Sequence, residues 1–301
     1  MAATEPDTVL RRFMAAERLP EDFAETARRH FLPLATTLAR RAAAAGRPLL
    51  VGIHGCQGSG KSTLAALLAQ LLRESHGLDC IDLSLDDFYL THAERERLAQ
   101  QVHPLLRTRG VPGTHDIGLL MRTLDALARP GDAVAVPRFD KARDDRRPPD
   151  QWPRLQPPLD LVILEGWCLG VPPQSEAQLA EPVNALEAEE DPDGRWRRFV
   201  NERLAEDYQA LHARVDYWIM LQAPGFDCVL AWRLEQERRL AERLSASGGD
   251  TGALMDEARL RRFVAHYQRL TEHALRVLPD RVDRLFRLDP QRHIRSREEP
   301  R

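Results

Sequence analysis

The segment GCQGSGKS, residues 55–62, matches the pattern GxxxxGK[ST] of a phosphate-binding loop. It follows a short apolar stretch and opens a long helical pattern, which is the context such a loop requires. Glycines there let backbone N–H groups turn toward phosphates at a helix N-terminus, while Lys61 reaches the outer phosphates and Ser62 can ligate Mg²⁺. The alternative is a tight turn without a ligand. The predicted nucleotide-binding residues are Gly55, Gln57, Gly58, Ser59, Gly60, Lys61, Ser62 and Thr63.

Carboxylates follow two other apolar, strand-like segments. Asp86 and Asp87 come directly after residues 80–85, and Glu165 lies at the end of residues 159–166. In a parallel sheet the carboxyl ends of the strands meet at one edge, so we expect these groups beside the phosphate loop. One aspartate could accept the proton of a substrate hydroxyl during phosphoryl transfer, whereas the alternative is that it caps the following turn. Glu165 is the expected second Mg²⁺ ligand, directly or through water.

Lysine is almost absent from this chain. Of the 43 Lys and Arg residues, the only lysines are Lys61 and Lys141. A position that keeps lysine against such a bias indicates a need for a compact ammonium that the larger guanidinium cannot replace. We therefore predict a functional role for Lys141, the alternative being a chance survival.

Composition excludes several classes of protein. The 43 basic residues balance 46 acidic ones, and 43% of residues are hydrophobic, as in a well-cored globular protein. No apolar run approaches the roughly 20 residues of a membrane span. The scattered arginines form no basic stripe, so we expect no nucleic-acid partner. An acidic N-terminal region without an apolar core fits no leader peptide and predicts a cytoplasmic protein. The widely spaced cysteines predict reduced thiols rather than disulfides or zinc ligands: Cys56, Cys80, Cys168 and Cys228.

Strand-like and helical patterns alternate along the chain, which predicts an α/β fold with a parallel sheet covered on both faces. Residues 1–48 are predicted to form an N-terminal helical extension and residues 49–301 a single domain. The predicted strands are 48–55, 80–85, 133–140, 159–166, 217–224 and, as the last one, 282–289. The predicted helices include 61–77 and 116–129, the second with Asp116 as its N-cap. The predicted loops include 86–95, 141–158 and the acidic segment 187–194.

Six segments in a fixed order resemble D-glycerate 3-kinase and its bacterial relatives, within the phosphoribulokinase, uridine kinase and pantothenate kinase superfamily. They are GCQGSGKS at 55–62, SLDDFY at 84–89, RGVPGTHD at 109–116, PRFDK at 137–141, EGW at 165–167 and WRLEQE at 232–237. The resemblance runs from about residue 50 to 280. It implies a P-loop NTPase fold, with a doubly wound parallel sheet, helices on both faces and a helical lid.

The resemblance also implies roles for individual residues. Asp86 would be the proton acceptor, with Asp87 as a neighbour. The residues implied for the acceptor pocket are Arg109, His115, Arg138 and Lys141, and those implied for the lid are Arg233, Arg238 and Arg239. An ordinary solvated helix face is the alternative for the lid arginines. Residues 141–150 differ from the pattern, because relatives carry small residues and glycines there. We expect the aromatic residues near these motifs to lie in the core: Phe88, Tyr89, Trp167 and Trp232.

Together these features predict an ATP- and Mg²⁺-dependent kinase of a small hydroxylated metabolite. D-glycerate, phosphorylated at its 3-hydroxyl, is the acceptor that the resemblance favours. The alternatives are a nucleoside or pantothenate kinase of the same superfamily and a P-loop ATPase that couples hydrolysis to partner binding. The sequence makes no prediction about oligomeric state.

Overall fold

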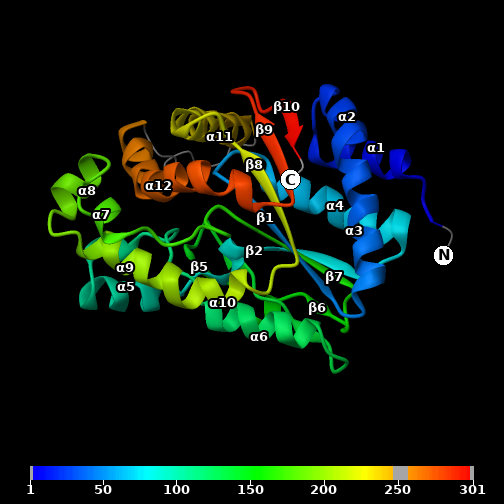
Figure 1. Ribbon diagram of the computed structural model, residues 1–301, viewed down its shortest axis with the longest axis horizontal. Coiled ribbons are helices and arrows are strands. Elements are labelled where there is room, and N and C mark those ends of the chain that lie inside the picture. Colours follow the sequence, from blue (N-terminus) through cyan, green and yellow to red (C-terminus); the bar gives the residue numbers. More distant parts are fainter. Residues whose placement is uncertain (1–2, 247–256, 299–301) are drawn as a thin grey trace.

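A computed structural model describes residues 3–246 and 257–298 of the chain and places a six-stranded sheet at its centre (Figure 1). The strand order is β10-β9-β8-β1-β7-β2, and all neighbouring pairs are parallel except β9 and β10. The strands are β1 (Leu49–Gly55), β2 (Cys80–Ser84), β7 (Leu161–Gly166), β8 (Tyr217–Gln222), β9 (Arg284–Leu288) and β10 (Ile294–Glu298). The predicted α/β fold with a parallel sheet is confirmed, although β10 follows the strand that was expected to be the last.

Alternate strand residues face two separate hydrophobic cores. On β1, Val51 and Ile53 lie in the core formed with α1 (Pro6–Glu17), α3 (Leu32–Ala45) and α4 (Lys61–His76). Leu50 lies in the opposite core, together with apolar residues of α6 (Ile117–Leu127), α9 (Arg195–Arg203) and α12 (Glu257–Val277). Figure 1 shows α3 and α4 on one side of the sheet and α6 and α10 on the other. Because both faces are covered, β1 and β7 are buried along their whole length, as expected for a doubly wound sheet.

Shorter elements complete the chain. The other helices are α2 (Asp22–Thr26), α5 (His92–Gln101), α7 (Glu176–Leu179), α8 (Ala185–Glu190), α10 (Gln209–His212) and α11 (Phe226–Ala246). Single helical turns span Ala27–Phe31, Leu85–Phe88, Pro104–Arg107, Pro149–Gln151, Leu204–Tyr208 and Pro279–Arg281. Two small ribbons pair β3 (Val134–Ala135) with β6 (Arg154–Leu155) and β4 (Phe139–Asp140) with β5 (Asp145–Arg146).

Helices α1 and α3 pack on α4, and α3 also contacts β1. Leu10 and Leu38 are fully buried in the same core as Leu68 of α4 and Val51 of β1. The predicted helices of residues 1–48 are therefore confirmed as helices, and they share a core with the sheet. The division of the chain into two units at residue 48 stays a prediction.

Two local predictions are wrong for identifiable reasons. Residues 133–140 do not join the central sheet, because Pro137 lacks the N–H group that a strand within a sheet must donate; only the short β3 and β4 form there. Residues 86–95 are not simply a loop, because Thr91 and Glu94 form a capping box that starts α5 at His92.

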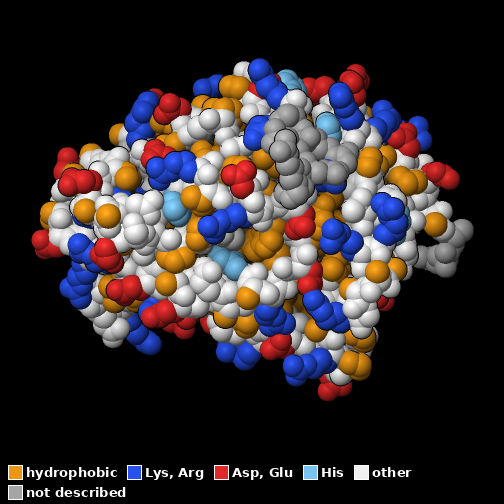
Figure 2. Space-filling view, in the orientation of Figure 1, with side chains coloured by type: hydrophobic (Ala, Val, Ile, Leu, Met, Phe, Trp, Pro, Cys, Tyr) orange, Lys and Arg blue, Asp and Glu red, His pale blue; other side chains and the backbone are white. Residues whose placement is uncertain are grey.

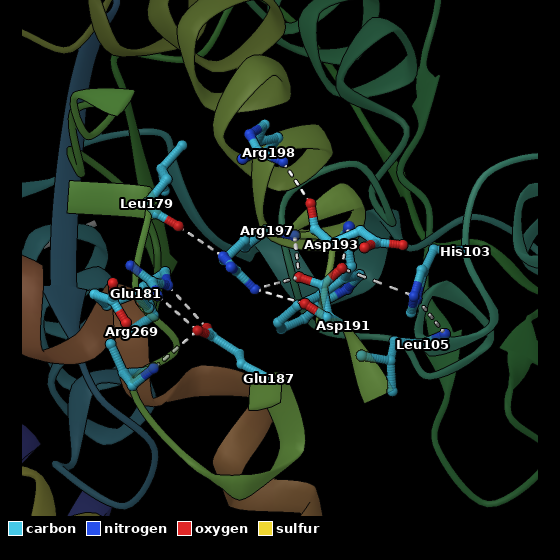
Figure 3. Close-up of polar contacts among 12 residues, drawn as sticks. His103, Leu105, Leu179, Glu181, Glu187, Asp191, Asp193, Arg197, Arg198 and Arg269 are labelled. Atoms are coloured by element: carbon cyan, nitrogen blue, oxygen red, sulfur yellow. Dashed lines mark hydrogen bonds and ion pairs between the residues drawn. The ribbon is translucent and has the colours of Figure 1, made fainter. Parts of the chain in front are cut away.

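The acidic segment 187–194, predicted as a solvated loop, is only partly solvated: Glu189, Glu190 and Asp193 are exposed, whereas two other carboxylates are buried. Glu187 and Asp191 are each only 1% exposed. Figure 3 shows that Arg269 of α12 and Arg197 of α9 reach them, with distances of 2.6 Å from Arg269 Nη2 to Glu187 Oε2 and 3.1 Å from Arg197 Nη1 to Asp191 Oδ2. Buried carboxylates require such partners. The acidic segment therefore anchors α8 between α9 and α12.

Acidic and basic side chains are interspersed over the face drawn in Figure 2. Within residues 3–246 and 257–298, no helix is long and apolar enough to cross a membrane. The four cysteines are free thiols, and three of them are buried.

Candidate active site

The phosphate loop lies between the end of β1 and the first residue of α4. Gly58 and Gly60 have φ angles of 80° and 91°, a backbone conformation that side chains disfavour. A Cβ atom on Gly58 would also lie 2.6 Å from Cβ of Trp232. The loop therefore needs glycine at residue 58 for two reasons, its backbone angle and its close contact with α11.

Three polar residues meet at the start of α4. Ser62 Oγ donates to Glu165 Oε1 at 2.8 Å, and Lys61 Nζ lies 3.8 Å from Glu165 Oε2. Glu165 is 5% exposed, and its Oε2 atom has no hydrogen-bond partner. A buried carboxylate oxygen without a donor fits a cation, so Ser62 and Glu165 are suitable Mg²⁺ ligands.

The described residues include no group of three or more His, Cys, Asp or Glu side chains that could hold a metal ion. This is compatible with the pair above, because Mg²⁺ commonly uses one or two protein ligands and takes the others from phosphates and water. Gln57 Oε1 and Ser59 Oγ in the phosphate loop are also buried without a partner. The loop thus presents several polar atoms that a bound ligand could satisfy.

Asp86 lies in the turn after β2, and both of its oxygens have partners. Lys141 Nζ is 2.6 Å from Oδ2, and the Tyr89 hydroxyl donates to Oδ1 at 2.9 Å. Burial alone would raise the pKa of this carboxyl, but the charges of Lys141 and Lys61 outweigh it and hold the pKa well below its ordinary value. Asp86 is therefore ionised at neutral pH and able to accept a proton.

Asp87 has a different environment. Its Oδ1 accepts from the N–H of Phe139 at 3.1 Å, and its Oδ2 lies 3.2 Å from Arg138 Nη1. Burial raises the pKa of Asp87, while the bond from Phe139 and the charge of Arg138 act in the opposite direction. These contacts hold the β4 segment against the turn after β2. Arg138 therefore pairs with Asp87 and has a structural role, whereas the two lysines act on Asp86.

His115 lies behind Asp86 in an aromatic stack. Its ring packs on Tyr89 with centroids 4.4 Å apart, and its Nδ1 is 2.6 Å from the hydroxyl of Tyr208. Burial lowers the pKa of His115 to about 4, so the ring is neutral at neutral pH. Its Nε2 atom is buried without a hydrogen-bond partner. Tyr208 was not predicted from the sequence, since nothing near it resembles a motif.

Arg109 contacts the segment that carries Lys141. Its guanidinium pairs with Asp144 and lies 5.4 Å from the ring centroid of Phe139. Asp144 also pairs with Arg95 Nη2 at 3.0 Å, and Arg95 is almost fully buried. These arginines therefore fix the loop that brings Lys141 to Asp86. Arg95 was missed because it lies in a stretch predicted as a loop.

No protein-family model matches the chain. The chain is 36% identical over 237 residues to the uncharacterized kinase mug58 of Schizosaccharomyces pombe, covering 74% of this chain and 79% of that protein. It is 32% identical over 230 residues to the chloroplastic D-glycerate 3-kinase of Arabidopsis thaliana, covering 73% of this chain and 46% of that protein. The solved D-glycerate 3-kinase from Cryptococcus neoformans superposes with a TM-score of 0.73 at 27% identity, covering 90% of this chain and 98% of that one.

The chain belongs to a family of P-loop kinases that includes the uncharacterized kinase mug58, and it is similar to D-glycerate 3-kinases. The family resemblance seen in the sequence is confirmed, and so is the P-loop kinase fold. The roles of the individual site residues stay predictions.

The lid predicted for this P-loop kinase falls on α11. Arg233 is half-buried there and lies 5.9 Å from the ring centroid of Phe263 on α12, whereas Arg238 is exposed. The side chain of Arg239 lies outside the described residues. The four aromatic residues predicted as core are confirmed as buried, each at most 3% exposed: Phe88, Tyr89, Trp167 and Trp232.

Proposed function

We propose that this P-loop kinase transfers the γ-phosphoryl group of ATP to the 3-hydroxyl of D-glycerate with Mg²⁺. The observation that carries the proposal is the position of Asp86, an ionised carboxylate held by Lys141 next to the phosphate-loop lysine. The similarity to D-glycerate 3-kinases supports the choice of acceptor.

The residues of the phosphate loop would bind and orient the nucleotide. Backbone N–H groups at the start of α4 and the ammonium of Lys61 would stabilise the negative charge of its phosphates. Ser62 and Glu165 would hold Mg²⁺, which when bound neutralises charge on the β- and γ-phosphates. The Ser62–Glu165 contact of 2.8 Å places these two residues close enough to share one ion.

Asp86 would take the proton of the attacking hydroxyl. The hydroxyl oxygen forms a bond to the γ-phosphorus, the bond from that phosphorus to the ADP oxygen breaks, and the hydroxyl proton moves to Asp86. Phosphoryl transfer passes through a loose transition state, so a weakly basic carboxylate is sufficient if it is well positioned. Tyr89 and Lys141 supply that positioning, one on each oxygen.

A cluster of positive charge next to Lys141 supports an anionic acceptor. A pocket of about 290 Å³ lies against the loop that follows Lys141. It is lined by Asp140, Arg143, Asp145, Arg146, Arg147 and Pro148. Among the described residues, the guanidinium groups of Arg143 and Arg147 have no hydrogen-bond or ion-pair partner, whereas Asp140 accepts backbone N–H groups at 3.0 and 3.2 Å. A carboxylate-bearing acceptor is therefore favoured over an uncharged nucleoside.

A coupled assay of ADP release tests the proposal with glycerate, uridine, pantothenate and ribulose 5-phosphate as acceptors. Of the four acceptors, we expect only D-glycerate to give rapid ADP release, with 3-phosphoglycerate as the product. Rapid release with another acceptor would reassign the substrate within the superfamily. ADP release that needs no acceptor would favour the ATPase alternative. The Asp86→Asn variant distinguishes kinase from ATPase activity, because it should remove only the acceptor-dependent rate.

A further inference from the structure

A residue that lies outside every sequence motif contacts the phosphate loop directly. Arg292 lies in the turn between β9 and β10, and its Nε donates to the carbonyl oxygen of Gly58 at 2.7 Å. The same guanidinium donates from Nη2 to Glu235 of α11 at 2.7 Å and lies 5.1 Å from the ring centroid of Trp232. One side chain therefore joins the phosphate loop, α11 and the C-terminal hairpin.

The turn that carries Arg292 is firmly held. Asp289 Oδ1 accepts the N–H groups of Gln291 and His293 at 2.8 and 2.9 Å. The Trp232 indole donates to the carbonyl of Pro290 at 2.8 Å. Arg292 itself has a φ angle of 69°, in the left-handed region that non-glycine residues seldom adopt. The contacts around the turn thus fix a conformation that aims Arg292 at Gly58.

The direction of the Gly58 carbonyl matters for anion binding. A loop that points its N–H groups at phosphates must point its carbonyl oxygens elsewhere, since a carbonyl facing a phosphate would repel it. A carbonyl turned into the protein needs a hydrogen-bond donor, and a charged donor forms the stronger bond. We propose that Arg292 is a positioning residue for nucleotide binding, because it keeps the Gly58 carbonyl turned away from the phosphates and fastens the loop to α11.

This inference rests on the nucleotide-binding part of the proposed function and does not depend on which acceptor is used. Its test therefore measures ADP binding by calorimetry in the absence of any acceptor. A failure to phosphorylate glycerate would leave that measurement unaffected.

Two replacements of similar shape isolate the hydrogen bond. In Arg292→Gln, the amide nitrogen is the same number of bonds from the backbone as Nε of arginine and can donate to Gly58. In Arg292→Met, a methyl group occupies that place and cannot donate. We expect Arg292→Met to weaken ADP binding by about tenfold or more, the effect of losing a hydrogen bond from a charged group, and Arg292→Gln to lose clearly less.

A structural role alone would not produce the remaining expected results. The KM for ATP should rise in Arg292→Met while the KM for the acceptor stays within about twofold, and millimolar methylguanidinium should restore ADP affinity to a truncated Arg292→Ala variant. The control is Arg281→Ala in the turn before β9, whose side chain is exposed and whose ADP affinity should not change. Equal affinities in Arg292→Gln and Arg292→Met, or wild-type affinity in both, would overturn the inference.

Discussion

Replacing Lys141 by arginine keeps the charge beside Asp86 and changes only its shape. Lys141 Nζ lies 2.6 Å from Asp86 Oδ2, and the Tyr89 hydroxyl already occupies the other oxygen. An arginine side chain is one atom longer and ends in a planar fork, so it cannot place a nitrogen at the same point without moving Asp86 or folding back. We therefore expect Lys141→Arg to misplace the proton acceptor.

The size of the effect follows from distance and exposure together. A misplacement of about 1 Å at a reacting group can cost about 10²-fold in rate. The Lys141 side chain is 63% exposed, so the longer arginine has room to adjust toward solvent and the displacement of Asp86 will be smaller. We expect a loss of roughly tenfold in kcat/KM for glycerate.

The assay is steady-state kinetics of ADP release, with thermal unfolding and ADP binding as controls for an intact fold. The melting temperature and the ADP affinity should both match wild type. The hydrogen bond described for the Lys141 side chain is the one to Asp86, which belongs neither to the hydrophobic core nor to the phosphate loop. An arginine variant with wild-type kcat/KM would refute the reasoning and make the retained lysine a compositional accident.

A second variant, Lys141→Gln, removes the positive charge beside Asp86 and so tests how strongly that charge affects the pKa of Asp86. Without Lys141 the ionised form of Asp86 is less stabilised, so the pKa of Asp86 rises toward its ordinary value. We expect carbon NMR of the Asp86 carboxyl to show it titrating at a higher pH in Lys141→Gln than in wild type, by an amount reduced by solvent screening of this exposed pair. An unchanged titration curve would show that Lys141 does not set the charge of Asp86.

Three further outcomes are expected. Lys61→Ala should lose several orders of magnitude in phosphoryl transfer with an intact fold, and a rate within about tenfold of wild type would contradict the phosphate-loop assignment. Asp86→Asn should abolish turnover while ADP still binds, whereas Asp87→Asn should reduce turnover less, and the reverse ranking would move the proton acceptor by one residue. Glu187→Gln should lower the free energy of unfolding by about 3 kcal/mol or more in urea titrations, because it leaves the buried Arg269 without its counter-charge. A Glu187→Gln protein as stable as wild type would show that the pair is replaceable.

The parts of the candidate site whose positions the sequence predicts depend on short-range spacing. The phosphate loop and the carboxylates after β2 and β7 are each placed by a strand that ends beside them, and a parallel sheet brings such ends together. Lys141 was singled out by the scarcity of lysine in the chain and by the family resemblance of PRFDK, and it lies against Asp86.

The parts that the sequence does not predict depend on partners distant in the chain. Glu187 is buried because Arg269 pairs with it from 82 residues away, and Arg292 reaches Gly58 across 234 residues. Neither contact leaves a local pattern. The acidic segment containing Glu187 was therefore predicted to be a surface loop. Nothing in the sequence around Arg292 distinguishes it from the other arginines of this arginine-rich chain.

The packing of the first helices on α4 has a practical consequence for anyone who wishes to express the kinase region alone. Leu10 and Leu38 cover apolar side chains of α4, the helix that begins with the phosphate-loop lysine. A truncated protein that starts at residue 49 would present this surface to water, and exposed apolar patches of that kind promote aggregation. We expect such a truncated protein to be insoluble although it retains every catalytic motif, and co-expression of residues 1–48 as a separate peptide offers a way to recover it.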